Sequence, residues 1–165
     1  MSECYRTMNL VAGTYDKSTK AFTLDLQSLT LTPPFSSSHS SPIKSVAVCG
    51  SFAASDDSTD KIHLYDFTTR STISLHHYSA TALSFYAPSL LVSANAAGSL
   101  SSWDIKSGKV AYLLEEAHST RVRGIVVPTD SNDDDDPYLM ASYVSGMFEW
   151  LLRRSHYLSI IQGQD

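Results

Sequence analysis

Histidine, serine, aromatic and aspartate residues recur in the same order along residues 39–150, and together these residue types could do chemistry. A serine hydroxyl, an imidazole and a carboxylate can form a hydrolytic triad. Such a serine needs an exposed turn like the GxSxG elbow, which this sequence lacks. Repetition instead favours a buried hydrogen-bonded network that stabilises each unit. The predicted repeat positions are His39, Ser55, Tyr65, Asp66, His77, Ser93, Trp103, Asp104, His118, Ser142 and Trp150.

Other histidines suggest a metal site, which the spacing does not support. His76 and His77 are adjacent, and His63 lies in the preceding segment. Adjacent residues of a strand point to opposite faces, so the two imidazoles cannot easily share one ion. The turn at 94–98 has a single glycine and does not form a phosphate-binding loop. We therefore predict no catalytic residue, no metal ligand, no cofactor and no small-molecule substrate.

An aspartate in the turn after the serine would complete each network. The first full unit offers Asp57 or Asp60, whereas the second has Ala96-Ala97 and the third has Val144-Ser145. An unpaired buried polar group costs a few kcal/mol, so an incomplete network is a poor stabiliser. Packing of Val, Leu and aromatic side chains is expected to hold the last two units.

Short strands must position these residues. Residues 20–26 alternate apolar and polar side chains, the period of a half-buried strand, and no amphipathic helix longer than two turns is indicated. Pro33-Pro34 is expected to end the third strand, and 36–42 is expected to be a flexible loop. The fold class is therefore all-β. The predicted strands are 10–16, 20–26, 29–31, 43–49, 51–55, 61–67, 71–75, 80–86, 90–94, 99–105, 109–114, 121–127, 138–143, 146–152 and 157–161.

The unit repeats about every 40 residues, from a leading His to a closing aromatic-Asp, which is the signature of the WD40 repeat family. A unit of four strands cannot bury its own apolar face, so the units must stack, as the blades of a β-propeller do. We expect a partial WD40-type β-propeller of about three and a half four-stranded blades over 8–152. The expected parts are a partial blade at 8–35, full blades at 39–75, 77–115 and 118–152, and a diverged C-terminal tail at 153–165.

Within this family the sequence resembles one branch over roughly residues 8–127. Segments 10–15, 41–48, 62–66 and 76–86 look like those of the WD40 proteins that interact with p21-activated kinase. These proteins are similar to the fungal WD40 factors required for assembly of the large ribosomal subunit. The resemblance implies a nuclear and nucleolar scaffold in maturation of the pre-60S particle. For animal members it also implies a brake on the kinase through direct binding.

The expected function is that of a non-catalytic scaffold whose blade edges and loops bind proteins, chiefly pre-60S assembly factors. One alternative is a signalling adaptor that negatively regulates a p21-activated kinase by binding its regulatory segment. The other is a nonfunctional truncated fragment, because a closed propeller has at least four blades.

The charge balance argues against direct RNA contact by this segment. The chain has 12 Lys and Arg against 17 Asp and Glu, a formal net charge of -5. Backbone contacts to nucleic acid need clustered cations, and those of this chain are dispersed. The acidic run 130–136 could contact a cation or a basic partner, but a solvated loop is the favoured interpretation. The cations considered are Lys17, Lys20, Lys44, Arg121, Arg123, Arg153 and Arg154.

Two features indicate the compartment. Cys4 and Cys49 lie far apart without a CxxC pattern, and both are expected to be reduced thiols. No secretory leader is recognisable, and no apolar run approaches the 18 residues that a membrane span needs. A soluble intracellular protein without membrane contact is therefore expected.

Overall fold

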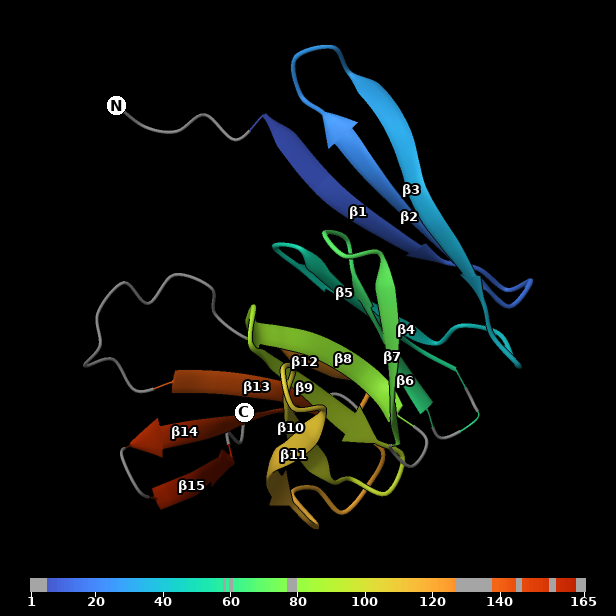
Figure 1. Ribbon diagram of the computed structural model, residues 1–165. Helices are drawn as coiled ribbons and strands as arrows, with labels where there is room; N and C mark the ends of the chain where they lie inside the picture. The colour runs from blue at the N-terminus through green and yellow to red at the C-terminus, as the bar shows by residue number, and fades with distance from the viewer. Residues whose placement is uncertain are drawn as a thin grey trace, which may run out of the picture.

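The computed structural model of the chain describes residues 6–57, 59, 61–76, 80–126, 138–144, 147–154 and 157–162. Throughout these residues the chain forms strands and turns and no helix, so the predicted all-β class is confirmed (Figure 1). The strands form one three-stranded sheet and three four-stranded sheets. Within every sheet, consecutive strands pair antiparallel with their sequence neighbours.

Each sequence unit forms its own sheet. The first sheet contains β1 (Thr7–Gly13), β2 (Ser18–Asp25) and β3 (Thr30–Ser38). The second contains β4 (Ser45–Cys49), β5 (Phe52–Asp56), β6 (Lys61–Asp66) and β7 (Ser71–His76). The third contains β8 (Ala80–Ala87), β9 (Leu90–Asn95), β10 (Leu100–Asp104) and β11 (Lys109–Leu114). The fourth contains β12 (Gly124–Val126), β13 (Tyr138–Val144), β14 (Met147–Arg154) and β15 (Tyr157–Gln162).

Four boundaries differ clearly from the predicted ones. The first strand was expected at 10–16, but β1 begins at Thr7 and ends at Gly13. The third strand was expected to end at Pro33-Pro34, but β3 continues through both prolines to Ser38. It is an edge strand, where a missing backbone N–H removes no ladder hydrogen bond if it faces outward. β12 is shorter than the expected strand 121–127. Beyond residue 152, where the last repeat was expected to end, β14 continues to Arg154 and β15 completes the fourth sheet.

Neighbouring sheets bury each other. β4 lies beside β8, and β12 lies beside β8 and β9 (Figure 1). One apolar cluster joins the second and third sheets, with Leu64 and Leu75 from one and Leu91 and Trp103 from the other. A second cluster joins the third sheet to the segment before the fourth, through Leu100 and Val122. The apolar face of a sheet is therefore removed from water by the next sheet, which is the main stabilising contribution.

The first sheet lacks an innermost strand among the described residues. β2 ends at Asp25 as β6 ends at Asp66 and β10 ends at Asp104, and β6 and β10 are the third strands of their sheets. β1 therefore corresponds to a second strand, and it contacts β4 of the next sheet. The position of Gly13 explains how closely β1 approaches. A Cβ on Gly13 would overlap the Ile43 side chain and lie 3.0 Å from Val46 Cγ1. The missing side chain lets the first sheet dock on the segment that leads into β4.

Candidate functional site

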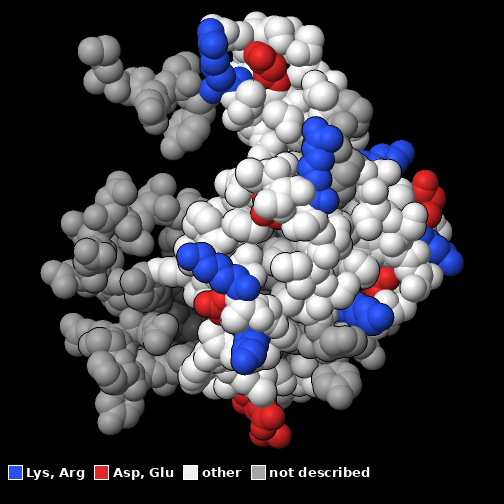
Figure 2. Space-filling view, viewed as in Figure 1, with Lys and Arg blue, Asp and Glu red and all other residues white. Residues whose placement is uncertain are grey.

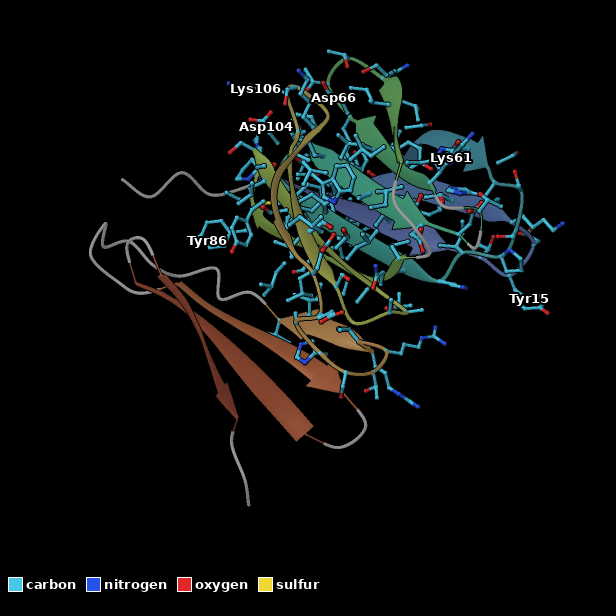
Figure 3. All side chains as sticks on the ribbon, turned by 90° about the horizontal axis from the view of Figure 1, so that it is seen from below. Tyr15, Lys61, Asp66, Tyr86, Asp104 and Lys106 are labelled. Carbon is cyan, nitrogen blue, oxygen red and sulfur yellow. The ribbon has the colours of Figure 1, made fainter. Side chains whose placement is uncertain are left out.

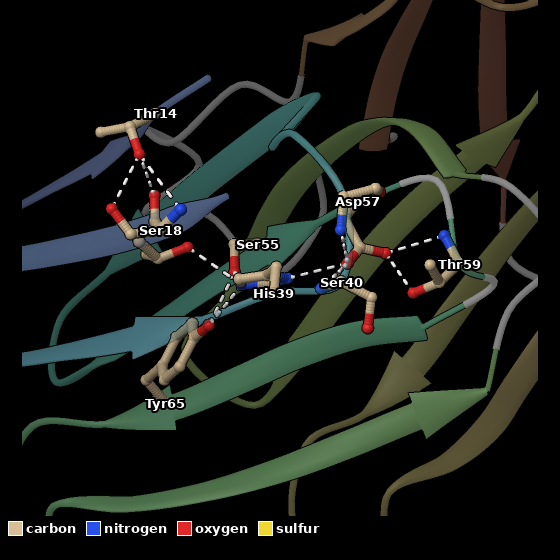
Figure 4. Close-up of polar contacts among 10 residues, drawn as sticks. Thr14, Ser18, His39, Ser40, Ser55, Asp57, Thr59 and Tyr65 are labelled. Atoms are coloured by element: carbon tan, nitrogen blue, oxygen red, sulfur yellow. Dashed lines mark hydrogen bonds and ion pairs between the residues drawn. The ribbon is translucent and has the colours of Figure 1, made fainter. Parts of the chain in front are cut away.

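His39 is the centre of a buried polar network between the first and second sheets. Its Nε2 lies 3.0 Å from Thr19 Oγ1, 3.0 Å from Ser55 Oγ and 2.9 Å from Tyr65 Oη. The hydroxyls of Ser55 and Tyr65 are also 2.9 Å apart (Figure 4). Thr19 belongs to β2, Ser55 to β5 and Tyr65 to β6, so one imidazole joins two sheets.

Asp57 holds the other side of the His39 ring. Its Oδ2 lies 3.3 Å from His39 Nδ1 and accepts hydrogen bonds from the backbone N–H groups of Ser40 (3.2 Å) and Ser41 (3.4 Å). Its Oδ1 accepts from the Thr59 N–H at 2.8 Å (Figure 4). Burial raises the pKa of Asp57, but hydrogen bonds from Thr59 and Ser41 outweigh burial and lower it overall. The sequence left Asp57 and Asp60 open for this position, and the structure places Asp57 there.

The imidazole of His39 is best described as neutral. Burial lowers its pKa, and the nearby Asp57 only partly opposes that change. A neutral ring with its proton on Nδ1 donates toward the carboxylate and leaves Nε2 to accept from a hydroxyl. The hydroxyls of Ser55 and Tyr65 can also hydrogen-bond to each other.

The order Ser55–His39–Asp57 has the connectivity of a hydrolytic triad, but the serine is inaccessible. Ser55 and Asp57 are each 0% exposed, and Tyr65 occupies the space beside the serine hydroxyl. A nucleophile must reach a substrate carbonyl and have oxyanion donors beside it. In this geometry the three groups can stabilise the fold, whereas attack on a substrate would require the sheets to separate.

The second repeat keeps part of the network with one replacement. Trp103 Nε1 donates to Ser93 Oγ at 2.8 Å, and both residues are buried. Asn95 lies two residues after this serine, as Asp57 lies two residues after Ser55. Asn95 Oδ1 accepts from the N–H groups of Ala97 (3.0 Å) and Ser99 (2.9 Å). The sequence analysis placed the turn acid of this unit at Ala96-Ala97, which is one residue too late. The equivalent of Asp57 is Asn95, so a side-chain amide takes the place of the carboxylate.

The remaining predicted network residues are described only in part. His118 is buried, with 4% of its surface exposed. His77 and the side chains of Ser142 and Trp150 lie outside the described residues. The backbone register of the fourth sheet differs from that of the second and third sheets. Trp150 lies opposite Ala141, one position before Ser142, whereas the aromatic residues of the second and third sheets lie opposite the residue two positions before their serine.

The closing aspartates cap turns and do not join the buried network. Asp66 Oδ1 accepts from the Thr68 N–H at 2.8 Å, and Asp104 Oδ1 accepts from the Ser107 N–H at 2.7 Å. Figure 3 shows both aspartates at one end of the sheets, away from Tyr15. Asp25, which sequence reasoning missed, caps the turn after β2 in the same way. The sequence does contain a signal for Asp25. Like Asp66 and Asp104, it is the last residue of the second-last strand of its sheet.

Hydrogen bonding shifts the pKa of all three aspartates downward. For Asp25 and Asp104 the largest cause is a backbone hydrogen bond, from Ser28 and Ser107 respectively. For Asp66 burial acts first and raises the pKa, and the hydrogen bonds of its turn reverse that effect. Each turn also has a residue of positive φ four positions after the aspartate: Leu29 (53°), Arg70 (56°) and Gly108 (66°). The repeat therefore includes this turn as well as the strands.

A second imidazole lies against the network. The ring centroids of His63 and His39 are 4.2 Å apart. Burial is the largest cause that lowers the pKa of His63, followed by repulsion from His39, while Asp57 raises it. Two protonated rings at this separation would repel each other strongly, so the folded state favours neutral imidazoles.

Acidification below about pH 6.5, the usual histidine pKa, is expected to destabilise the protein. Because the folded-state pKa values of His39 and His63 are lowered, the unfolded chain binds more protons in this range. The free energy of unfolding then falls as pH falls, by at most about 1.4 kcal/mol per pH unit for each imidazole. Urea denaturation between pH 8 and 5 measures this slope, and His63→Gln should reduce it. A stability that increases below pH 6.5 would contradict the expectation.

Metal binding and thiol chemistry are two other kinds of chemistry that the described part of the chain could offer. No three His, Cys, Asp or Glu side chains gather there as a metal site. Cys49 is a free thiol whose pKa is raised by burial, and Cys4 lies outside the described residues. Within those same residues no helix is long and apolar enough to span a membrane.

Surface charge is scattered where it can be seen. On the face drawn in Figure 2, Lys and Arg side chains stand apart from one another, with Asp and Glu between them. The acidic run 130–136 and the side chains of Arg153 and Arg154 lie outside the described residues.

No protein-family model matches the chain, and no curated protein matches its sequence.

Proposed function

We propose that the chain is a WD40-type β-propeller segment that acts as a non-catalytic scaffold for protein binding in large ribosomal subunit assembly. The observation that carries this proposal is the His39–Ser55–Tyr65–Asp57 network inside a series of antiparallel four-stranded sheets. The side chains that could do chemistry, Ser55, His39 and Asp57, are buried and hold the sheets together. What remains for function is the exposed set of turns at the two ends of the sheets.

The assignment to ribosome assembly rests on the resemblance over residues 8–127. That resemblance implies a location in the nucleus and nucleolus and pre-60S assembly factors as partners. Scaffolds of this type contact partners through turns whose exposed aromatic side chains act as anchors. Among the described residues, Tyr15 is the most exposed large apolar side chain, at 89%, and it points away from the sheets in the β1–β2 turn (Figure 3).

Sedimentation of the tagged full chain in cell extracts tests the function. Co-migration with large-subunit precursors and enrichment in nucleoli are expected. Signal confined to the cytosol and free of these particles would rule the proposal out. In that case binding of the purified chain to the regulatory segment of a p21-activated kinase would support the adaptor role, and its absence would remove that role as well.

A matched pair of variants tests which end of the sheets makes the contact. Tyr15→Ala removes the exposed aromatic side chain of the β1–β2 turn and is expected to reduce the particle-bound fraction several-fold. Leu29→Ala changes an exposed apolar residue (76%) in the β2–β3 turn and is expected to leave that fraction unchanged. Equal effects of the two variants would contradict a contact through the β1–β2 turn.

A further inference from the structure

Strand β11 is an unusually apolar open edge. It is the outermost strand of the third sheet and pairs there only with β10. Val110, Tyr112 and Leu113 are 46%, 49% and 49% exposed. An edge strand with free N–H and C=O groups can pair with another strand unless charge, proline or a bulge prevents it.

Two other outer strands, β3 and β7, are protected in ways that β11 is not. β3 contains Pro33-Pro34, and β7 has Ser or Thr at three of its six positions, 71, 72 and 74. β11 has five apolar residues in succession, 110–114, after a single lysine. Its one protection is a bulge opposite the Ser102–Trp103 step, which adds local twist and limits any added strand to a short pairing.

The sequence of β11 is complementary to itself in the antiparallel direction. With Tyr112 on a twofold axis, Lys109 of one copy lies opposite Glu115 of the other, and Val110 lies opposite Leu114. Ala111 then lies opposite Leu113, and the two Tyr112 rings meet. Opposite charges, apolar pairs and aromatic pairs are the cross-strand combinations that stabilise antiparallel sheets.

We propose that β11 pairs with β11 of a second copy of this chain, forming a twofold-symmetric dimer through one continuous sheet. The charge pattern fits this partner because an antiparallel second copy places Glu115 opposite Lys109 at both ends of the pairing. A closed twofold interface uses the same patch on both copies. A pairing of the seven residues 109–115 from each copy buries less surface than stable dimers do. The dissociation constant is therefore expected to be on the order of 10–100 µM. The pairing does not depend on the ribosome-assembly role.

Sedimentation equilibrium of the intact chain between about 5 and 200 µM tests the dimer. The mean mass should rise from that of one chain to that of two and stop there. A constant monomer mass over this range would overturn the proposal. So would growth beyond two chains, because an edge that adds further strands is not closed by a twofold axis.

Charge reversal tests the register. Lys109→Glu and Glu115→Lys each place like charges opposite one another at both ends, and each is expected to weaken homodimerisation about tenfold. A mixture of the two variants restores both attractive pairs and should dimerise as tightly as the unaltered chain. The mixture contains the same two substituted chains as the separate samples. Any effect of a substitution on the folding of one chain is therefore present in both, and only the pairing between chains differs. A mixture that is no tighter than either variant alone would overturn the proposed register.

A second pair of variants locates the edge. Val110→Lys and Ile73→Lys change residues of equal exposure (46%) on two outer strands, β11 and β7. Only Val110→Lys is expected to reduce dimerisation, because Val110 lies opposite Leu114 of the other copy. Equal losses, or a loss only with Ile73→Lys, would place the contact elsewhere and overturn the proposal.

Discussion

Gly98→Ala is expected to lower the free energy of unfolding by about 3–4 kcal/mol, the sum of left-handed strain and overpacking. Gly98 has a φ of +91°, and a Cβ there would fall on the carbonyl oxygen of His118 and lie 3.0 Å from that of Thr120. The backbone cannot yield cheaply, because the His118 N–H also donates to the Gly98 carbonyl at 3.0 Å. Thermal denaturation should show a midpoint about 10 °C lower.

Two other glycines separate the causes of that loss. Gly108 has a φ of +66°, but its nearest neighbour for a Cβ is Leu75 Cδ2 at 3.4 Å, an ordinary contact. Gly108→Ala therefore measures backbone strain alone, about 1 kcal/mol or slightly more. Gly124 has nothing within 4 Å and no positive φ, so Gly124→Ala should be nearly neutral. If Gly98→Ala cost no more than Gly108→Ala, the close packing against His118 would be refuted.

His39→Ala is expected to lower the free energy of unfolding by about 3 kcal/mol. Removal of the ring takes away the partner of three hydroxyls, on Thr19, Ser55 and Tyr65. It also leaves the fully buried Asp57 carboxylate without its imidazole. Buried polar groups without partners account for most of the cost. Urea denaturation measures the total, and hydrogen exchange shows where protection is lost.

The location of the loss distinguishes a link between sheets from a purely local network. Because Thr19 lies on β2, His39→Ala should increase exchange in β1, β2 and β3 as well as in β5 and β6. Ser93→Ala is the control, since it removes only the Trp103 hydrogen bond within the third sheet and should cost about 1 kcal/mol. Unchanged protection of the first sheet in His39→Ala would contradict the proposed link.

Sequence periodicity was enough to place most strands, because alternation and turn residues act locally. Expected segments such as 43–49, 61–67 and 109–114 match β4, β6 and β11 within two residues at each end. Predictions from local sequence were wrong where the end of a strand depends on the position of that strand in its sheet. Two prolines did not end β3, because that strand lies at an edge.

The site was partly predictable for the same reason. His39, Ser55 and Tyr65 were identified by their recurrence, but Thr19 was not, because it belongs to the preceding unit and meets His39 only when two sheets pack. Asn95 was missed because the turn acid was sought one residue too late. Counting two positions from each serine, as Asp57 stands to Ser55, would have found it.

By itself the sequence determined that the chain is a series of short antiparallel strands with one repeated set of polar residues. Both follow from spacing along a single unit. Only the tertiary structure decided which polar groups are buried together and which strand edges stay open. These properties depend on the faces that neighbouring sheets cover, and such contacts join residues that are distant in the chain.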